Sequence, residues 1–139
     1  WKDTGKAEDI LDANRLVLGR LRGRVEGTVE DSELVGEVVV EAGAVVRGST
    51  VFGPAIVGAN ATVERAYVGP FTTIGDDVTV RDAELEYTVV GARTLIERVG
   101  TRIQASLLGE DVILTGHDGR PSSHRLIVGD ESRIELREM

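Results

Sequence analysis

Aliphatic residues recur in this chain every five or six positions, which matches neither the helix period of 3.6 nor the strand period of 2. In the segment "VGPFTTIGDDVTV", residues 68–80, the aliphatic positions Val68, Ile74 and Val80 are surrounded by Gly, Thr and Asp. The full series is Val40, Val46, Phe52, Val57, Val63, Val68, Ile74, Val80, Leu85, Val90 and Ile96. A spacing this regular indicates an internal repeat, and it limits the possible folds more than any other feature.

Every third member of this series belongs to one of three stacks, which predict a coil with three faces. The stacks contain Val40, Val57, Ile74, Val90; Val46, Val63, Val80, Ile96; and Phe52, Val68, Leu85, and they continue at Ile103, Leu108 and Leu114. Short strands would pair in parallel from coil to coil, with Gly or Asp turns at the corners and the aliphatic stacks inside. Glycines directly after inward positions, such as Gly58, Gly75 and Gly91, suit close turns. We therefore predict a mainly β fold, a parallel β-helix, in preference to a β-sandwich.

Residues 7–21, "AEDILDANRLVLGRL", predict one amphipathic helix ahead of the repeat. Its apolar stripe would comprise Ile10, Asn14, Val17, Leu18 and Leu21, with Leu11 at the margin. Gly23 is the expected stop signal. A single helix of this length is marginal alone, so it needs either the end of the following domain or another neighbour to cover. We therefore divide the chain into residues 1–23, a loop with this helix, and residues 24–139, the repeat.

The segment after Leu114 predicts a projecting loop followed by a return of the repeat. "TGHDGRPSSHR" is rich in turn formers and has no periodicity. "LIVGDESRIEL" then places Val128 and Ile134 six residues apart again. Because a solenoid end needs a cap against edge pairing, we expect this segment to dock as a last rung or short hairpin.

Composition excludes several classes of function. The net charge of −8 opposes binding to nucleic acid or an anionic membrane, since phosphates would be repelled. The absence of cysteine excludes disulfides and thiolate metal sites. No apolar run approaches the roughly 20 residues that span a bilayer, and no signal-peptide pattern is present, so we expect a cytoplasmic protein. The chain opens with Trp1 in place of Met, which we expect of a fragment or processed piece.

Several stretches resemble known families. "IVGANATV", "VGPFTTIGDDVTV" and "LLGEDVIL" are similar to hexapeptide repeats, and this resemblance implies a left-handed parallel β-helix. "WKDTGKAEDILDANRLVL" resembles the end of the catalytic domain of long-form glucose-1-phosphate thymidylyltransferases, and the resemblance runs on to "SSHRLIVGDESRIEL". It implies that residues 1–23 end such a catalytic domain. Residues 24–139 would be its hexapeptide-repeat β-helix with a carboxy-terminal loop and capping rung, serving assembly or regulation.

The resemblance also implies a chemistry for the complete enzyme. Members of that family join dTTP to glucose 1-phosphate and release pyrophosphate, with Mg²⁺ as cofactor. Asp3 in "WKDTG" matches the family's magnesium-binding aspartate, and carboxylate oxygens suit that hard cation; without the resemblance, "DTG" would be taken as a turn entering a helix. Trp1 could line the sugar pocket or simply pack. Relatives that use uridine or cytidine nucleotides share the architecture, so base and sugar stay open.

The family's glycine-rich nucleotide loop has no counterpart in this chain, so we assign no catalytic residue and expect the chain alone to be inactive. Two alternatives remain open. Some hexapeptide-repeat proteins are acyltransferases with a histidine general base, for which His117 and His124 are the only candidates. The chain could also be a non-enzymatic homo-oligomerisation module, with Leu85, Tyr87 and Val89 on one surface strand. Carbonic anhydrases of this fold need three zinc-binding histidines and are excluded.

Overall fold

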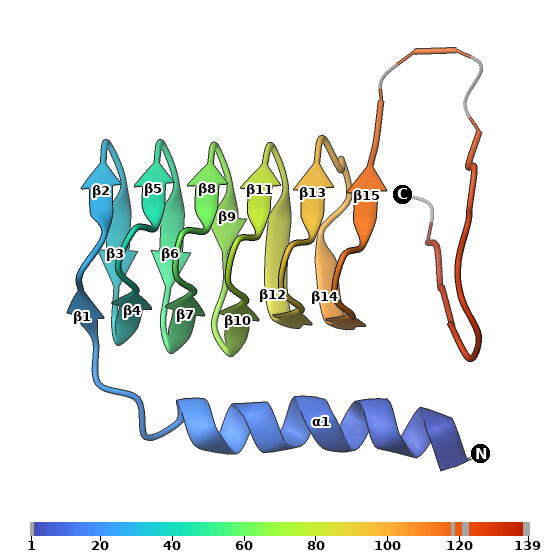
Figure 1. The fold of residues 1–139 in the computed structure, drawn as a ribbon, viewed down its shortest axis with the longest axis horizontal. Coiled ribbons are helices and arrows are strands. Elements are labelled where there is room, and N and C mark those ends of the chain that lie inside the picture. Colours follow the sequence, from blue (N-terminus) through green and yellow to red (C-terminus); the bar gives the residue numbers. More distant parts are fainter. Residues whose placement is uncertain (1, 118, 121–122, 138–139) are drawn as a thin grey trace.

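The computed structural model describes residues 2–117, 119–120 and 123–137, and of residues 2–5 it describes the backbone only (Figure 1). One helix, α1 (Lys2–Leu18), precedes a series of short strands. The strands are β1 (Arg24–Val25), β2 (Thr28–Glu30), β3 (Glu33–Val35), β4 (Val38–Val40), β5 (Val45–Arg47), β6 (Thr50–Phe52), β7 (Ala55–Val57), β8 (Thr62–Glu64), β9 (Tyr67–Val68), β10 (Thr72–Ile74), β11 (Thr79–Arg81), β12 (Glu84–Val90), β13 (Leu95–Glu97), β14 (Ile103–Leu108) and β15 (Ile113–Thr115).

The strands form a parallel solenoid with three faces, which confirms the predicted β-helix. One face runs in the order β2, β5, β8, β11, β13, β15, and every pair in it is parallel. The other two faces form one sheet, because β12 pairs with β9 at Leu85 and with β10 at Val89. Between these positions the backbone bends at Tyr87, where φ is +48°. The solenoid begins at β1, one coil earlier than the series that starts at Val40.

The predicted stacks fill the interior, with one exception. Val46, Val63 and Val80 are fully buried and lie side by side in the register of their strands. Phe52 is wrongly placed by the sequence prediction, because Val51 is the fully buried residue of β6 and pairs with Val68. The middle residue of this three-residue strand points inward, and the ring is turned out of the narrow interior. The Phe52 ring lies instead 5.7 Å from that of Tyr67.

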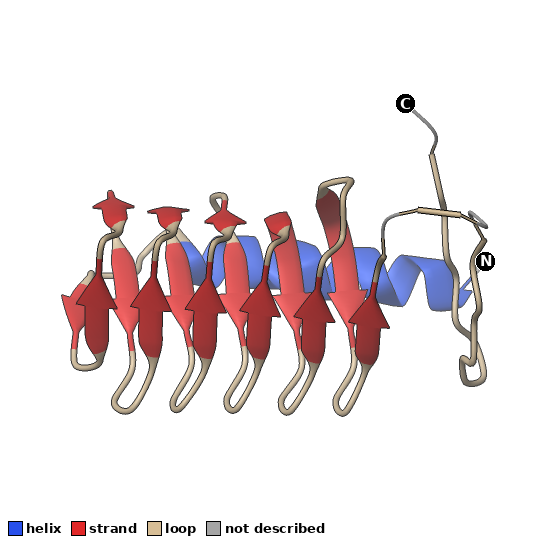
Figure 2. Cartoon of the chain, turned by 90° about the horizontal axis from the view of Figure 1, so that it is seen from above, coloured by secondary structure: helices blue, strands red, loops and turns tan. Residues whose placement is uncertain are grey.

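Helix α1 lies lengthwise along the solenoid, beside the face that contains β4, β7 and β10 (Figures 1 and 2). Its buried residues are Leu11 and Leu18, whereas Ile10 and Val17 of the predicted stripe are 48% and 67% exposed. A helix rises about 1.5 Å per residue, so a contact every three or four residues roughly matches the 4.7–4.9 Å between strands. This match keeps Asn14 and Leu18 of the predicted stripe on the solenoid side, replaces Ile10 by Leu11 and leaves Val17 exposed.

The helix also ends earlier than the sequence predicts. It stops at Leu18, and the Gly19 amide donates a hydrogen bond to the Arg15 carbonyl at 3.0 Å. Gly23 lies just before β1, so it is not the stop. The segment 19–23 therefore serves as the connection from helix to solenoid. No helix among the described residues is long and apolar enough to cross a membrane.

The described residues after β15 form no strand and stand beyond the last coil (Figure 2). The large apolar side chains of this part are exposed, namely Leu126, Ile127, Val128, Ile134 and Leu136. The capping rung expected from "LIVGDESRIEL" is thus not formed in this arrangement. The strands β14 and β15 consequently end the two sheets.

Candidate functional site

The seam between helix α1 and the solenoid joins the amino-terminal segment to the repeat. The Thr73 hydroxyl on β10 donates to Asn14 Oδ1 at 2.8 Å, and the Tyr87 hydroxyl on β12 donates to Asp12 Oδ1 at 2.8 Å. Because β10 and β12 are neighbours in successive coils, the two bonds set both the rotation and the axial position of the helix. Leu18 at the end of the helix is 1% exposed and adds apolar burial.

Two corners of the solenoid that carry aromatic residues shape this seam. Phe71 and Tyr87 both have positive φ, +62° and +48°, which residues other than Gly, Asn and Asp seldom adopt. The Phe71 ring lies 5.2 Å from the Arg15 guanidinium carbon. A shallow hollow of about 260 Å³ results, lined by Arg15, Pro70, Phe71, Glu86 and Tyr87. The hydrogen bond to Asp12, followed by burial, raises the pKa of Tyr87 above its ordinary value.

The assembly surface predicted from Leu85, Tyr87 and Val89 is not present in the structure. Leu85 is fully buried inside the solenoid, and the bend at Tyr87 separates it from Val89. The three residues therefore do not share an exposed strand. Tyr87 instead contacts the helix through its hydrogen bond to Asp12. The sequence offered little to find these seam residues, because Asn14 and Thr73 lie 59 positions apart.

The structure leaves the roles predicted for Asp3 and Trp1 untested. Asp3 belongs to the first turn of α1, but its side chain lies outside what is described, and so does the whole of Trp1. The described residues contain no group of three or more His, Cys, Asp or Glu side chains that could hold a metal ion.

Both histidines are exposed on the segment after β15. Neither His117 nor His124 lines the hollow at the seam. A general base must lie within hydrogen-bond reach of a bound acceptor, and neither imidazole lies at that hollow. It therefore gives no support to the acyltransferase alternative.

Charged side chains alternate along the outer surface of the face formed by β2, β5, β8, β11 and β13. This ion ladder consists of Glu30, Arg47, Glu64, Arg81 and Glu97, one residue from each successive coil. Glu64 accepts hydrogen bonds from Arg81 Nε at 2.6 Å and from Arg47 Nη1 at 2.9 Å. Its side chain is 15% exposed. The bond from Arg81, followed by that from Arg47, outweighs burial and lowers the pKa of Glu64.

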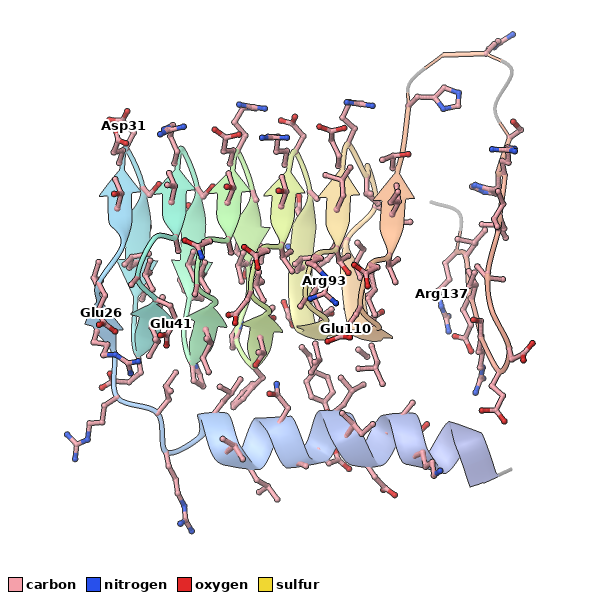
Figure 3. All side chains as sticks on the ribbon, viewed as in Figure 1. Glu26, Asp31, Glu41, Arg93, Glu110 and Arg137 are labelled. Atoms are coloured by element: carbon pink, nitrogen blue, oxygen red, sulfur yellow. The ribbon has the colours of Figure 1, made fainter. Side chains whose placement is uncertain are left out.

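Similar ion pairs link other coils at the corners. Arg93 binds Asp111 at 2.8 Å and Glu110 at 3.5 Å (Figure 3). Sequence analysis would have found these partners by comparing charges one coil apart, because each pair is separated by 17 or 18 positions. The arginines of the ladder are paired with carboxylates, so these side chains stabilise the stacking of coils and do not form a phosphate-binding patch.

The ladder predicts a loss of stability in acid. The folded-state pKa of Glu64 lies below its unfolded value, so its contribution is present above the ordinary pKa of 4.5 and is lost as the pH falls through the folded pKa. We expect the urea midpoint of the unsubstituted chain to decrease when the pH is lowered from neutral to below 4.5. Glu64→Gln should make this decrease smaller. Glu33→Gln, at an exposed site on β3 outside the ladder, is the matched control. Equal pH dependence in Glu64→Gln and the unsubstituted chain would contradict the assignment.

Comparison with known proteins gives a consistent set of relatives, although no family model matches the chain. It is 44% identical over 137 residues to a glucose-1-phosphate thymidylyltransferase of Streptomyces griseus, which covers 98% of this chain and 38% of that protein. A glucose-1-phosphate thymidylyltransferase of Streptomyces antibioticus is 42% identical with the same coverage. A low-salt glycan biosynthesis nucleotidyltransferase of Haloferax volcanii is 40% identical over 140 residues, 98% of this chain and 39% of that protein. The chain thus spans well under half the length of these relatives.

Proposed function

We propose a function from one premise: this chain is homologous, over nearly all of its length, to the carboxy-terminal part of glucose-1-phosphate thymidylyltransferases. In the complete enzyme, dTTP and glucose 1-phosphate would react to dTDP-glucose and pyrophosphate. This chain would supply the last segment of the catalytic domain, residues 1–23, and the β-helix. It would act in the cytoplasm, where nucleoside triphosphates are available.

The contacts of helix α1 support a role in holding the catalytic part on a rigid base. Asp3 lies in the first turn of the helix, and Leu11, Leu18 and the bonds from Thr73 and Tyr87 attach that helix to the solenoid. Mg²⁺ in the complete enzyme would neutralise charge on the reacting phosphates, with Asp3 as one of its ligands by resemblance. The flat faces of the solenoid suit symmetric self-association, and we therefore expect a homo-oligomer.

A chimera tests this proposal. The part of the S. griseus relative that precedes its match to this chain would be joined ahead of Trp1, and dTDP-glucose formation measured with dTTP, glucose 1-phosphate and Mg²⁺. We expect the chimera to be active. Asp3→Ala should slow it by at least about 10 to 100-fold, which is the cost of losing an outer-shell partner of a metal ligand, whereas Asp9→Ala at an exposed position of α1 should not. Equal rates for Asp3→Ala and the unsubstituted chimera would contradict the role of Asp3.

Two further measurements bear on the chain alone. Purified residues 1–139 should release no pyrophosphate from dTTP and glucose 1-phosphate, because the nucleotide loop is missing. Magnesium-dependent release would contradict the proposal that this chain alone is inactive.

Light scattering should give a mass above that of one chain. A monomer mass at high concentration would remove the assembly role.

A further inference from the structure

The solenoid has an open end where its last strands lack a following coil. β15 pairs with β13, and β14 pairs with β12, and no described strand follows either of them. Ile113 on β15 is 75% exposed, and Leu107 on β14 is 39% exposed. Leu108 and Leu114, the last inward residues, are only partly buried against the core. A parallel edge with apolar side chains is a template for another strand.

The tail segment, residues 123–137, already has the backbone of a coil corner. In four successive coils an inward residue is followed by Gly and one further residue, and then by a residue with positive φ. The values are +59° at Asn60, +57° at Asp77, +60° at Arg93 and +59° at Asp111. The tail repeats this order in "VGDE", where Glu131 has φ of +63°. It also repeats the next step, because Ile134 follows Val128 by six positions, as Leu114 follows Leu108.

The corner glycines give an independent indication of a missing coil. A methyl group at Gly58 would meet the backbone of Gly75, and one at Gly91 would meet the backbone of Gly109. At Gly109 and Gly129 nothing lies within 4 Å of such a group. A further coil with Gly129 stacked on Gly109 would give both residues the close neighbour that the earlier glycines have.

We propose that the tail segment is a detached final coil, a strap that closes on the open end of its own solenoid. Val128 would stack on Leu108 and Ile134 on Leu114, and their neighbours would follow in parallel register. Ile127 would then lie beside Leu107, and Arg133 beside Ile113. Closure buries apolar residues that are exposed in the detached arrangement, where the tail with Arg137 stands beyond the last coil (Figure 3). The proposal goes beyond the function proposed above and does not depend on it.

Chain length permits this closure. From Ile96 the chain reaches Leu108 through the third face in 12 positions, and from Leu114 it reaches Val128 in 14. The connection is thus only two positions longer than in the preceding coil, which is enough for closure and leaves little slack. A connection this short favours the chain's own end over a second copy as the docking site.

Charge explains why the strap can stand open. Closure brings Asp130 and Glu131 next to Glu110 and Asp111. Among the residues that the structure describes, Arg93 pairs with Glu110 and Asp111, and no cation is paired with Asp130 or Glu131. Repulsion between like charges opposes docking and is weakened by salt. The strap thus balances apolar burial against carboxylate repulsion, and salt should shift it toward the closed state.

Engineered cysteines test the register, because the chain contains no cysteine of its own. In Leu107→Cys with Ile127→Cys, and in Ile113→Cys with Arg133→Cys, mild oxidation should form a disulfide within one chain, as seen on a non-reducing gel. Both pairs occupy exposed positions, so folding is preserved. The off-register pair Leu107→Cys with Leu136→Cys should cross-link far more slowly. Disulfides between chains, no disulfide, or equal rates for the off-register pair would overturn the proposal.

A second variant checks the stacking of the glycines. Gly109→Ala, combined with the pair at 107 and 127, should slow cross-linking about tenfold, since the added methyl would overpack against Gly129. High salt should speed cross-linking of the unsubstituted pair. An unchanged rate in Gly109→Ala, or slower cross-linking at high salt, would contradict the closed arrangement.

Discussion

Ile74→Asp is expected to lower the free energy of unfolding by about 4 to 5 kcal/mol. Ile74 is fully buried on β10, between Val57 and Val90 of the neighbouring coils. A carboxylate at this position would enter an interior of aliphatic side chains without a cation or donor to pair with it. Urea unfolding followed by circular dichroism measures the change, and failure of the variant to fold at all would agree with the prediction.

The matched control for Ile74→Asp is the same substitution at Ile113. That residue also lies in a strand of the solenoid, but it points outward and is 75% exposed. We expect Ile113→Asp to change the free energy of unfolding by less than about 0.5 kcal/mol. An unchanged urea midpoint in Ile74→Asp, or equal losses in both variants, would contradict the assignment of inward positions.

Gly75→Ala is expected to destabilise the chain by about 3 kcal/mol, at the upper end of overpacking costs. A methyl group at Gly75 would lie 2.7 Å from the Val90 carbonyl oxygen and 3.1 Å from the Ala92 nitrogen. These are backbone atoms of the next coil, which cannot move aside as a flexible side chain could. The Gly75 amide also donates to the same Val90 carbonyl at 2.9 Å, so the added methyl would disturb a hydrogen bond between coils.

Gly100→Ala provides the comparison for Gly75→Ala, because nothing lies within 4 Å of a methyl group at Gly100. Thermal unfolding of both variants should show a lower midpoint for Gly75→Ala alone. Gly75 shows no positive φ, so any loss would report on close approach between coils and not on backbone strain. Equal midpoints for the two variants would mean that the coils can separate to admit a methyl group.

The aliphatic spacing was sufficient to predict the interior of the solenoid. Val63, Val80 and Ile96 are buried as predicted, because each coil repeats the same choice of inward and outward positions. The misplacement of Phe52 shows the limit of this argument. Val51 and Phe52 are adjacent and both apolar. Spacing alone therefore could not decide which of the two side chains points into the interior after the corner that follows β5.

The candidate site was less accessible from sequence. Asp3 and Trp1 were identified by resemblance alone, and the structure does not test them. The seam at Asn14, Thr73 and Tyr87 was missed because its partners belong to different elements far apart in the chain. The pairing of charges in the ion ladder was missed as well, because it becomes visible only when residues one coil apart are compared.

The sequence by itself determined the repeat, the corners and the identity of most buried residues, because these depend on short-range alternation between aliphatic and turn-forming residues. The tertiary structure decided which side of helix α1 is buried and where that helix ends. It also decided which charges meet and that the tail segment stands detached. Each of these depends on the match between helix rise and coil spacing, or on contacts between residues one or more coils apart. Such long-range distances are set only when the coils stack.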